Sequence, residues 1–156
     1  MWPWILLGGI PVGAVAALLT WGPLKRFGKG VQTERARELF LLQRERLEAK
    51  FVTAASASGK PRGLRWKDCD FESDIELARE RATGQLVALV SVTVQFEAIP
   101  GSDMEGLPAV GNLRNASAVF YFHRGQWHTA GKAVFNLNPA EVIQHFKNQY
   151  EHVTTG

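Results

Sequence analysis

An uncharged, apolar segment runs from Trp2 to Leu24 near the start of the chain. A helix rises about 1.5 Å per residue, so a segment of this length can cross a hydrocarbon core of roughly 30 Å. Indole side chains favour the headgroup boundary, and they stand near both ends of this segment, at Trp2, Trp4 and Trp21. The pattern predicts a transmembrane anchor over residues 1–24.

A cleaved signal peptide is the alternative interpretation, because residues 14–16 have the small-x-small pattern of a cleavage site. Signal peptides begin with basic residues, however, and here the cations follow the apolar segment, at Lys25, Arg26 and Lys29. Such cations mark the cytoplasmic side of a membrane. We therefore expect a single-pass protein with its N-terminus outside, a basic hinge over residues 25–32, and a domain over residues 33–153 on the cytoplasmic side.

Small residues recur every four positions within the predicted anchor, at Gly9, Gly13 and Ala17. On a helix they share one face, where a second transmembrane helix can approach closely. Glycine and alanine are common in any transmembrane helix, so this spacing alone does not require a partner. We expect Lys25, Arg26 and Lys29 to contact lipid headgroups together with the three tryptophans, at about 1 kcal/mol per charge on an anionic surface.

A long amphipathic helix is predicted over residues 33–58, with Thr33 as its N-cap. Gly59 and Pro61 then end it. Apolar residues recur at steps of three and four and form one stripe: Ala36, Leu39, Phe40, Leu47, Phe51, Ala54 and Ala55. A coiled coil and a membrane-surface helix are alternatives. Packing against a sheet of the same chain is favoured, because strand patterns follow.

Alternation of apolar and polar residues is clearest over residues 86–97, where Val90, Val92, Val94 and Phe96 share one face. Its first half is apolar on both faces, which predicts a central strand. A further strand is predicted over residues 64–71. Residues 75–81 are ambiguous: a capping box at Ser73–Glu76 favours a helix, whereas the turn Thr83-Gly84 favours the strand that we adopt.

A long loop over residues 99–115 precedes a predicted hairpin of residues 116–123 and 127–137 around Arg124–Gln126. Asn138-Pro139-Ala140-Glu141 predicts the start of a last helix. Its expected inward residues are Val142, Ile143, Phe146 and Tyr150.

The expected fold class is therefore α+β: a long helix packed on an antiparallel meander of about five strands, with a C-terminal helix. This element order is similar to that of cystatin-like and NTF2-like folds, and to small tethered domains of respiratory-complex assembly and translocase proteins. The similarity concerns element order over about 120 residues, and no family-specific motif accompanies it.

The composition and charge of the chain argue against several classes of function. Hydrophobic residues make up 46% and charged residues 21% of the 156 residues, which is typical of a folded protein. The formal net charge of +3 is small and acids alternate with bases, so no nucleic-acid partner is expected. The single cysteine, Cys69, allows no internal disulfide. Its acidic neighbours Asp68 and Asp70 oppose a reactive thiolate.

Three groups of residues are candidates for chemistry. His123 and His128 flank the predicted hairpin and offer two metal ligands, but a zinc site needs a third, so no metal is expected. An acidic run at alternate positions, Asp68, Asp70, Glu72, Asp74 and Glu76, forms either a site for a cation or basic partner or a solvated strand edge. The aromatic group Trp66, Phe120, Tyr121, Phe122, Trp127 and Phe135 lines a pocket or forms the core.

No motif for nucleotide binding, serine hydrolysis, zinc proteolysis or dithiol chemistry occurs, so no catalytic residue and no cofactor is assigned. The sequence favours a membrane-anchored, non-enzymatic interaction module, a subunit or assembly factor of a larger membrane protein complex, whose partners are the bilayer and a membrane protein. The alternative is a tethered NTF2-like ligand-binding domain or enzyme with a pocket between helix 33–58 and the sheet.

Overall fold

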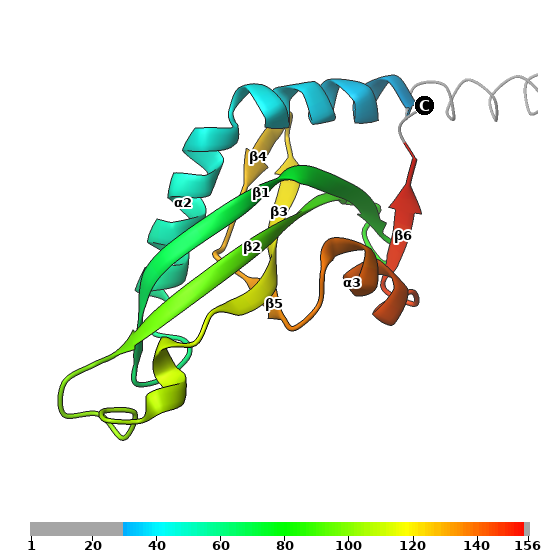
Figure 1. The fold of residues 1–156 in the computed structure, drawn as a ribbon. Coiled ribbons are helices and arrows are strands. Elements are labelled where there is room, and N and C mark those ends of the chain that lie inside the picture. The colour runs from blue at the N-terminus through cyan, green and yellow to red at the C-terminus, as the bar shows by residue number, and fades with distance from the viewer. Residues whose placement is uncertain (1–29, 155–156) are drawn as a thin grey trace, which may run out of the picture. The chain divides into compact units, whose positions relative to one another are not determined.

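An antiparallel sheet with helices against both of its faces makes up the part of the chain that the computed structural model describes, residues 30–154 (Figure 1). Residues 36–154 form one compact unit. The helical elements are a helix over residues 30–42, α2 (Arg44–Ala57), the short 3-10 helix η1 (Pro108–Gly111) and α3 (Pro139–His145). The predicted α+β class is confirmed for this part of the chain.

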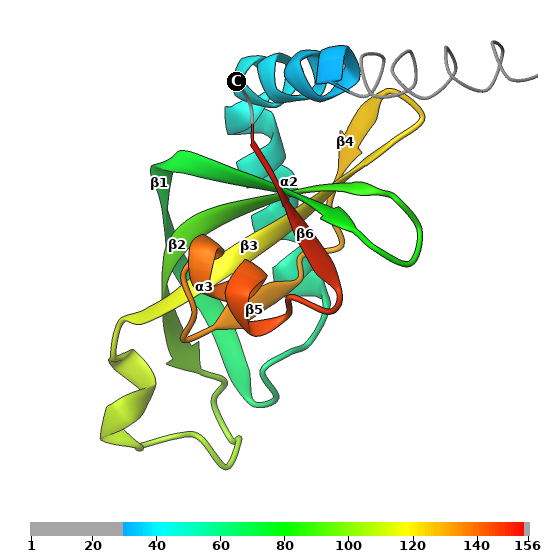
Figure 2. The same cartoon turned by 90° about the vertical axis from the view of Figure 1, so that its right-hand side faces the viewer.

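The sheet has six strands within the described residues, in the order β4-β3-β2-β1-β6, with β5 also paired to β3 (Figure 2). Their bounds are β1 (Leu64–Glu80), β2 (Leu86–Ala98), β3 (Arg114–His123), β4 (Gln126–His128), β5 (Ala133–Phe135) and β6 (Tyr150–Val153). All pairs are antiparallel, as expected for strands joined by short turns. Strands β1 to β4 form the predicted meander.

Strand β2 confirms the prediction from alternation. It lies between β1 and β3, and Val90, Val92, Val94 and Phe96 are buried while the residues between them are partly exposed. Those four side chains join the hydrophobic cluster that faces α2. The odd positions Val87 and Leu89 join a second cluster on the other face. Period-two alternation therefore assigns the two faces of the sheet correctly.

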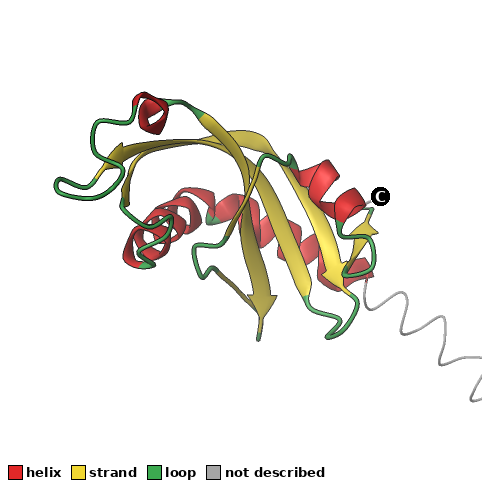
Figure 3. Cartoon of the chain, turned by 90° about the horizontal axis from the view of Figure 1, so that it is seen from below, coloured by secondary structure: helices red, strands yellow, loops and turns green. Residues whose placement is uncertain are grey.

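The sheet curves strongly, and α2 lies along its concave side (Figure 3). Phe40, Leu47, Phe51 and Ala55 point from the helices into the main core and are at most 1% exposed. The predicted apolar stripe of this segment is thus confirmed, as is its packing on a sheet of the same chain. We call the opposite face of the sheet its outer face, where α3 and Tyr150 cover Val87, Leu89 and Val119.

The predicted single helix over residues 33–58 is wrong at two points. Thr33, predicted as its N-cap, lies inside a helix that already includes residues 30–32. The helix also turns sharply at Gln43, between residues 36–42 and α2 (Figure 1). Gln43 has φ −103° and ψ 8°, outside the helical range. On β1, the backbone carbonyls of Glu72 and Ser73 accept hydrogen bonds from the guanidinium of Arg44, which also pairs with Glu48 at 2.7 Å. The turn thus lets the helix follow the curved sheet.

Two predicted strands, residues 64–71 and 75–81, are one long strand, β1. Phe71 pairs with Val92 and Ile75 with Val90, so residues 72–74 lie opposite Ser91 alone and form a bulge. A bulge interrupts period-two alternation, which is why the pattern looked like two elements. The residues of the possible capping box therefore belong to this bulge and strand rather than to a helix.

The last part of the chain differs from the prediction in two ways. Residues 127–137 form two short strands, β4 and β5, rather than one, and α3 ends at His145. Tyr150, expected on the last helix, lies on β6, which pairs with the end of β1. The helix start is confirmed: the side chain of Asn138 accepts from the Glu141 backbone, and that of Glu141 accepts from the Asn138 backbone.

The predicted transmembrane anchor of residues 1–24 and most of the basic hinge lie outside the described residues. Within residues 30–154, the structure has no helix with the length and apolarity needed to cross a bilayer.

Candidate functional site

The expected membrane-contact residues are outside the part of the chain that the structure describes. This holds for the small-residue face of Gly9, Gly13 and Ala17, and for the headgroup residues Trp2, Trp4, Trp21, Lys25, Arg26 and Lys29. Their assignment remains a prediction from sequence, and the sites described below belong to residues 36–154.

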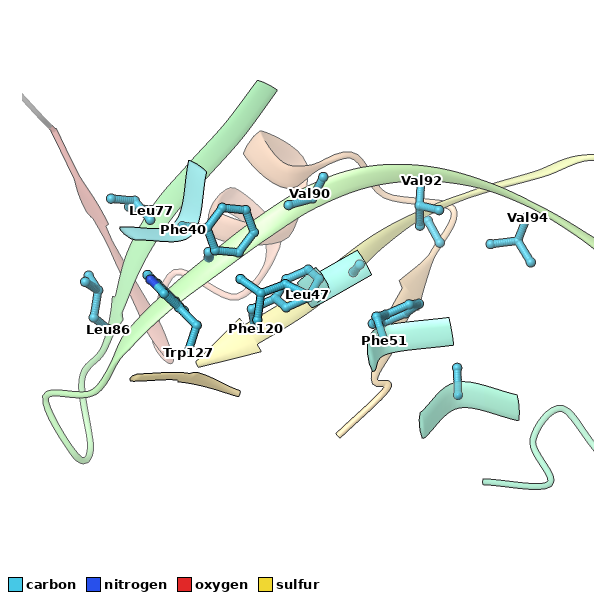
Figure 4. Close-up of a cluster of buried hydrophobic side chains, with 14 of the residues drawn as sticks. Phe40, Leu47, Phe51, Leu77, Leu86, Val90, Val92, Val94, Phe120 and Trp127 are labelled. Atoms are coloured by element: carbon cyan, nitrogen blue, oxygen red, sulfur yellow. The ribbon is translucent and has the colours of Figure 1, made fainter. Parts of the chain in front are cut away.

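Aromatic side chains fill the space between α2 and the sheet (Figure 4). The ring of Phe51 lies 5.8 Å from that of Phe120, and the ring of Phe40 lies 5.2 Å from those of Phe120 and Trp127, between centroids. Trp127 is 2% exposed, and its Nε1 donates to the carbonyl of Ala36 at 2.7 Å. The region under the middle of α2 is therefore a packed core.

The aromatic group singled out in the sequence divides between three places. Phe120 and Trp127 belong to this core. Phe122 is partly buried beside them, with its ring centroid 5.1 Å from that of Trp127. Trp66 and Phe135 are partly buried beyond the C-terminal end of α2, where they line a pocket. Tyr121 lies in the third place, where its ring stacks on that of His128 with centroids 5.5 Å apart.

A polar groove with a volume of about 760 Å³ is built on the outer face of the sheet. Ser91, at the centre of β2, and Glu72, in the bulge of β1, line it. The remaining wall comes from the start of β3, from residues 136–138 and from α3. We call this site the outer groove.

Four of the chain's five asparagines line the outer groove: Asn112, Asn115, Asn136 and Asn138. An amide side chain offers both donors and an acceptor, so such a lining suits a polar partner. Asn138 is already engaged, because its Oδ1 accepts from the Glu141 backbone at 2.9 Å. Among the described residues, the Asn112 and Asn136 amides have no hydrogen-bond partner, so they are available to a ligand.

Charges of both signs also line the outer groove. Arg114 supplies a guanidinium, while Glu72 and Glu141 supply carboxylates. Glu141 is held by the backbone of Asn138 at 2.8 Å. Amide, hydroxyl and oppositely charged groups together can hydrogen-bond and pair with a mixed polar surface of the kind found at the rim of a protein interface.

The predicted hairpin carries its histidines on one face of the sheet but not opposite each other. The turn is Arg124-Gly125, with φ of 50° and 73°, and His123 pairs with Gln126 while Tyr121 pairs with His128. The two imidazoles are therefore diagonal neighbours, with centroids 6.4 Å apart. Within residues 30–154, no three histidine, cysteine, aspartate or glutamate side chains converge as metal ligands would.

Most of the acidic run of β1 lies on the outer face, as its alternate spacing predicts. Asp68 pairs with Gln95 and Asp70 with Thr93, so both lie on that face, and Glu72, in the bulge, lines the outer groove there. Asp74 also belongs to the bulge. Glu76 is also on the outer face, where its carboxylate contacts His152 Nε2 at 2.9 Å. The contact between Glu76 and His152 could not be predicted from the sequence, because β6, which carries His152, was not predicted.

Cys69 is partly buried and points toward the main core, opposite Val94. Burial, and to a smaller extent the charge of Asp68, raises the pKa of its thiol to about 11. The thiol is therefore protonated at neutral pH. The expected opposition to a thiolate has burial as its larger cause, and of the two acidic neighbours only Asp68 contributes.

Comparisons with protein-family models, with curated proteins and with solved structures give no match to this chain.

Proposed function

We propose that this chain is a non-enzymatic interaction module, held at a membrane by residues 1–24 and serving as a subunit or assembly factor of a larger membrane protein complex. The outer groove is the observation that carries the proposal for the domain. Its amides and charges are exposed on the outer face of the sheet, whereas aromatic side chains occupy the region under the middle of α2. A domain built in this way offers surface polar groups to a partner.

The sequence supports the membrane part of the proposal. The apolar segment Trp2–Leu24 is followed by cations, which favours a cytoplasmic location for the domain. The small-residue face of Gly9, Gly13 and Ala17 suits contact with a second transmembrane helix. A tether raises the effective concentration of the domain near a membrane partner, so the outer groove needs little intrinsic affinity.

We also propose that the domain is related in architecture to the cystatin-like and NTF2-like folds. A curved antiparallel sheet that wraps around one long helix supports this, and so does the order of the helix before the meander. The bulge in β1 and the strand β6 are additions to the element order on which this proposed relation rests.

Site-specific photocrosslinking in living cells tests the proposal. A photoreactive amino acid is placed at Gly13 in the expected helix-packing face and, in a second variant, at Asn112 in the outer groove. Val15, on the opposite side of the predicted helix, and Asn148, the asparagine outside the groove, are the matched controls. We expect both test positions to crosslink to subunits of one membrane complex, and the control positions to give much weaker products.

Two results would overturn the proposal. One is release of the intact chain into the soluble fraction of lysed cells or by alkaline carbonate, because a transmembrane anchor resists both treatments. The other is a protein that, after extraction in mild detergent, is a monomer with no crosslinked partner at either test position.

A further inference from the structure

A second pocket, with a volume of about 390 Å³, lies beyond the C-terminal end of α2, and we call it the end pocket. Its walls come from the turn after α2, from Trp66 on β1 and from residues 130–135 around β5. The volume falls within the range of sites that bind small organic molecules.

The floor of the end pocket is apolar and held in place by the core. The rings of Trp66 and Phe135 lie 6.1 Å apart with planes inclined at 44°, and both rings contact Phe96, which is 2% exposed. Trp66 Nε1 donates to the carbonyl of Lys60 at 2.8 Å. Because its only donor is engaged, the indole can offer a ligand only apolar ring surface.

The rim of the end pocket is cationic. Lys60 and Lys132 line it, and no aspartate or glutamate does. Neither ammonium group has an ion-pair partner among the described residues. The hydroxyl of Ser58 is already engaged, donating to the Ala55 carbonyl at 2.6 Å. The lining therefore combines two lysines that have no ion pair with two aromatic rings.

We propose that the end pocket binds a small aryl carboxylate, with its ring against Trp66 and Phe135 and its carboxylate between Lys60 and Lys132. An apolar body matches the floor because burying it removes apolar surface from water. A single negative charge matches the rim, since its two lysines have no ion-pair partner among the described residues. This site is separate from the outer groove, and the proposal does not rest on membrane anchoring or on a protein partner.

Photoaffinity labelling of the purified full chain in mild detergent tests this proposal. The probe is benzophenone-4-carboxylate, and its neutral counterpart is benzophenone-4-carboxamide. Concentration-dependent labelling, mapped by mass spectrometry, gives a dissociation constant for each. We expect the carboxylate to label peptides that contain residues 58–66 and 130–135, and to bind more tightly than the carboxamide.

The contributions of the two lysine charges and of the pocket's shape to probe binding are then tested with separate variants. The double variant Lys60→Gln/Lys132→Gln should weaken carboxylate binding by about three- to thirtyfold and leave carboxamide binding unchanged, as expected for two solvent-accessible ion pairs. The matched control Lys67→Gln/Lys147→Gln removes two lysines that do not line the pocket and should change neither. Ala133→Met, which fills the pocket, should weaken both probes. Hydrogen exchange checks that each variant remains folded.

The proposal is overturned if labelling is spread over the chain or concentrated in residues 1–24, or if the two lysine variants affect carboxylate binding equally. It is also overturned if acid and amide bind with the same affinity. None of these results bears on the proposed membrane complex, because that proposal is tested by crosslinking to a protein partner, and its test position in the domain, Asn112, does not line the end pocket.

Discussion

Gly131 shows how a single residue fixes the relation between α2 and the segment before β5. Its φ is +73°, and a Cβ at this position would lie 2.3 Å from the backbone nitrogen of Ala55 and 2.7 Å from the Ala54 carbonyl carbon. Those atoms belong to the helix backbone, which cannot move aside as a side chain can. Only glycine allows the segment to pack directly on α2 at this point.

Gly131→Ala should therefore destabilise the domain by about 2–5 kcal/mol, from the cost of a left-handed alanine plus that of overpacking. Gly84→Ala is the matched control: φ is again +73°, but a Cβ there meets nothing within 4 Å. Gly84→Ala should lower the free energy of unfolding by only about 1–2 kcal/mol. Hydrogen exchange of the full chain in nanodiscs measures both losses in the free energy of unfolding. Equal losses would contradict the close approach to α2.

Cys69 gives a pH-dependent prediction, and because it is the only cysteine the readout is unambiguous. The pKa of its thiol is about 11 in the folded chain, owing to burial and then to Asp68, against 9.0 for an unperturbed thiol. Iodoacetamide should thus label the folded chain slowly at pH 8, with a rate that still rises about eightfold per pH unit at pH 10. In urea the rate should level off above about pH 9.

The raised pKa of the Cys69 thiol also makes the free energy of unfolding depend on pH in a defined direction. Since the unfolded thiol ionises first, this group favours folding fully below about pH 9, and its contribution is lost as pH rises toward 11. Asp68→Asn should speed labelling at pH 8 only modestly, because burial is the larger cause of the raised pKa. A plateau in the labelling rate of the folded wild type near pH 9 would show that the thiol is not desolvated.

At the scale of elements, the sequence predicts best where one signal is strong and local. The alternation of β2, the helix start at Asn138 and the apolar stripe of α2 were each confirmed. The turn at Gln43 was missed because neither glycine nor proline marks it. It depends on contacts of Arg44 with Glu72 and Ser73, which lie about 30 positions along the chain.

The candidate sites were harder to predict than the elements. The outer groove combines Glu72, Ser91, Asn112 and Asn136, which come from different strands and loops. Asparagine is common in turns, so its positions in sequence give no sign that four of these side chains share a groove. The end pocket was partly anticipated, since Trp66 and Phe135 were singled out as pocket candidates, but its place beyond α2 depends on the pairing of β5 with β3.

At the scale of the whole domain, one sheet serves two cores. On β2, Ala88 and Val90 belong to the core under α2, while Val87 and Leu89 belong to the cluster under α3. Because adjacent residues of one strand face both clusters, disturbing either cluster loosens the backbone that supports the other. Residues 36–154 should therefore unfold as one cooperative unit.

Val142→Ala on α3 tests this cooperativity, since the side chain is fully buried in the outer cluster. Deleting two methyl groups there should cost about 2 kcal/mol. We expect hydrogen exchange under mildly destabilising conditions to accelerate equally in peptides from α3, β2 and α2, although Val142 lies on the face opposite α2. Gln144→Ala, at an exposed position of the same helix, should change none of them. Acceleration confined to α3 and β6 would instead mean that the outer layer unfolds by itself, and that the wall of the outer groove formed by α3 is separable from the sheet beneath it.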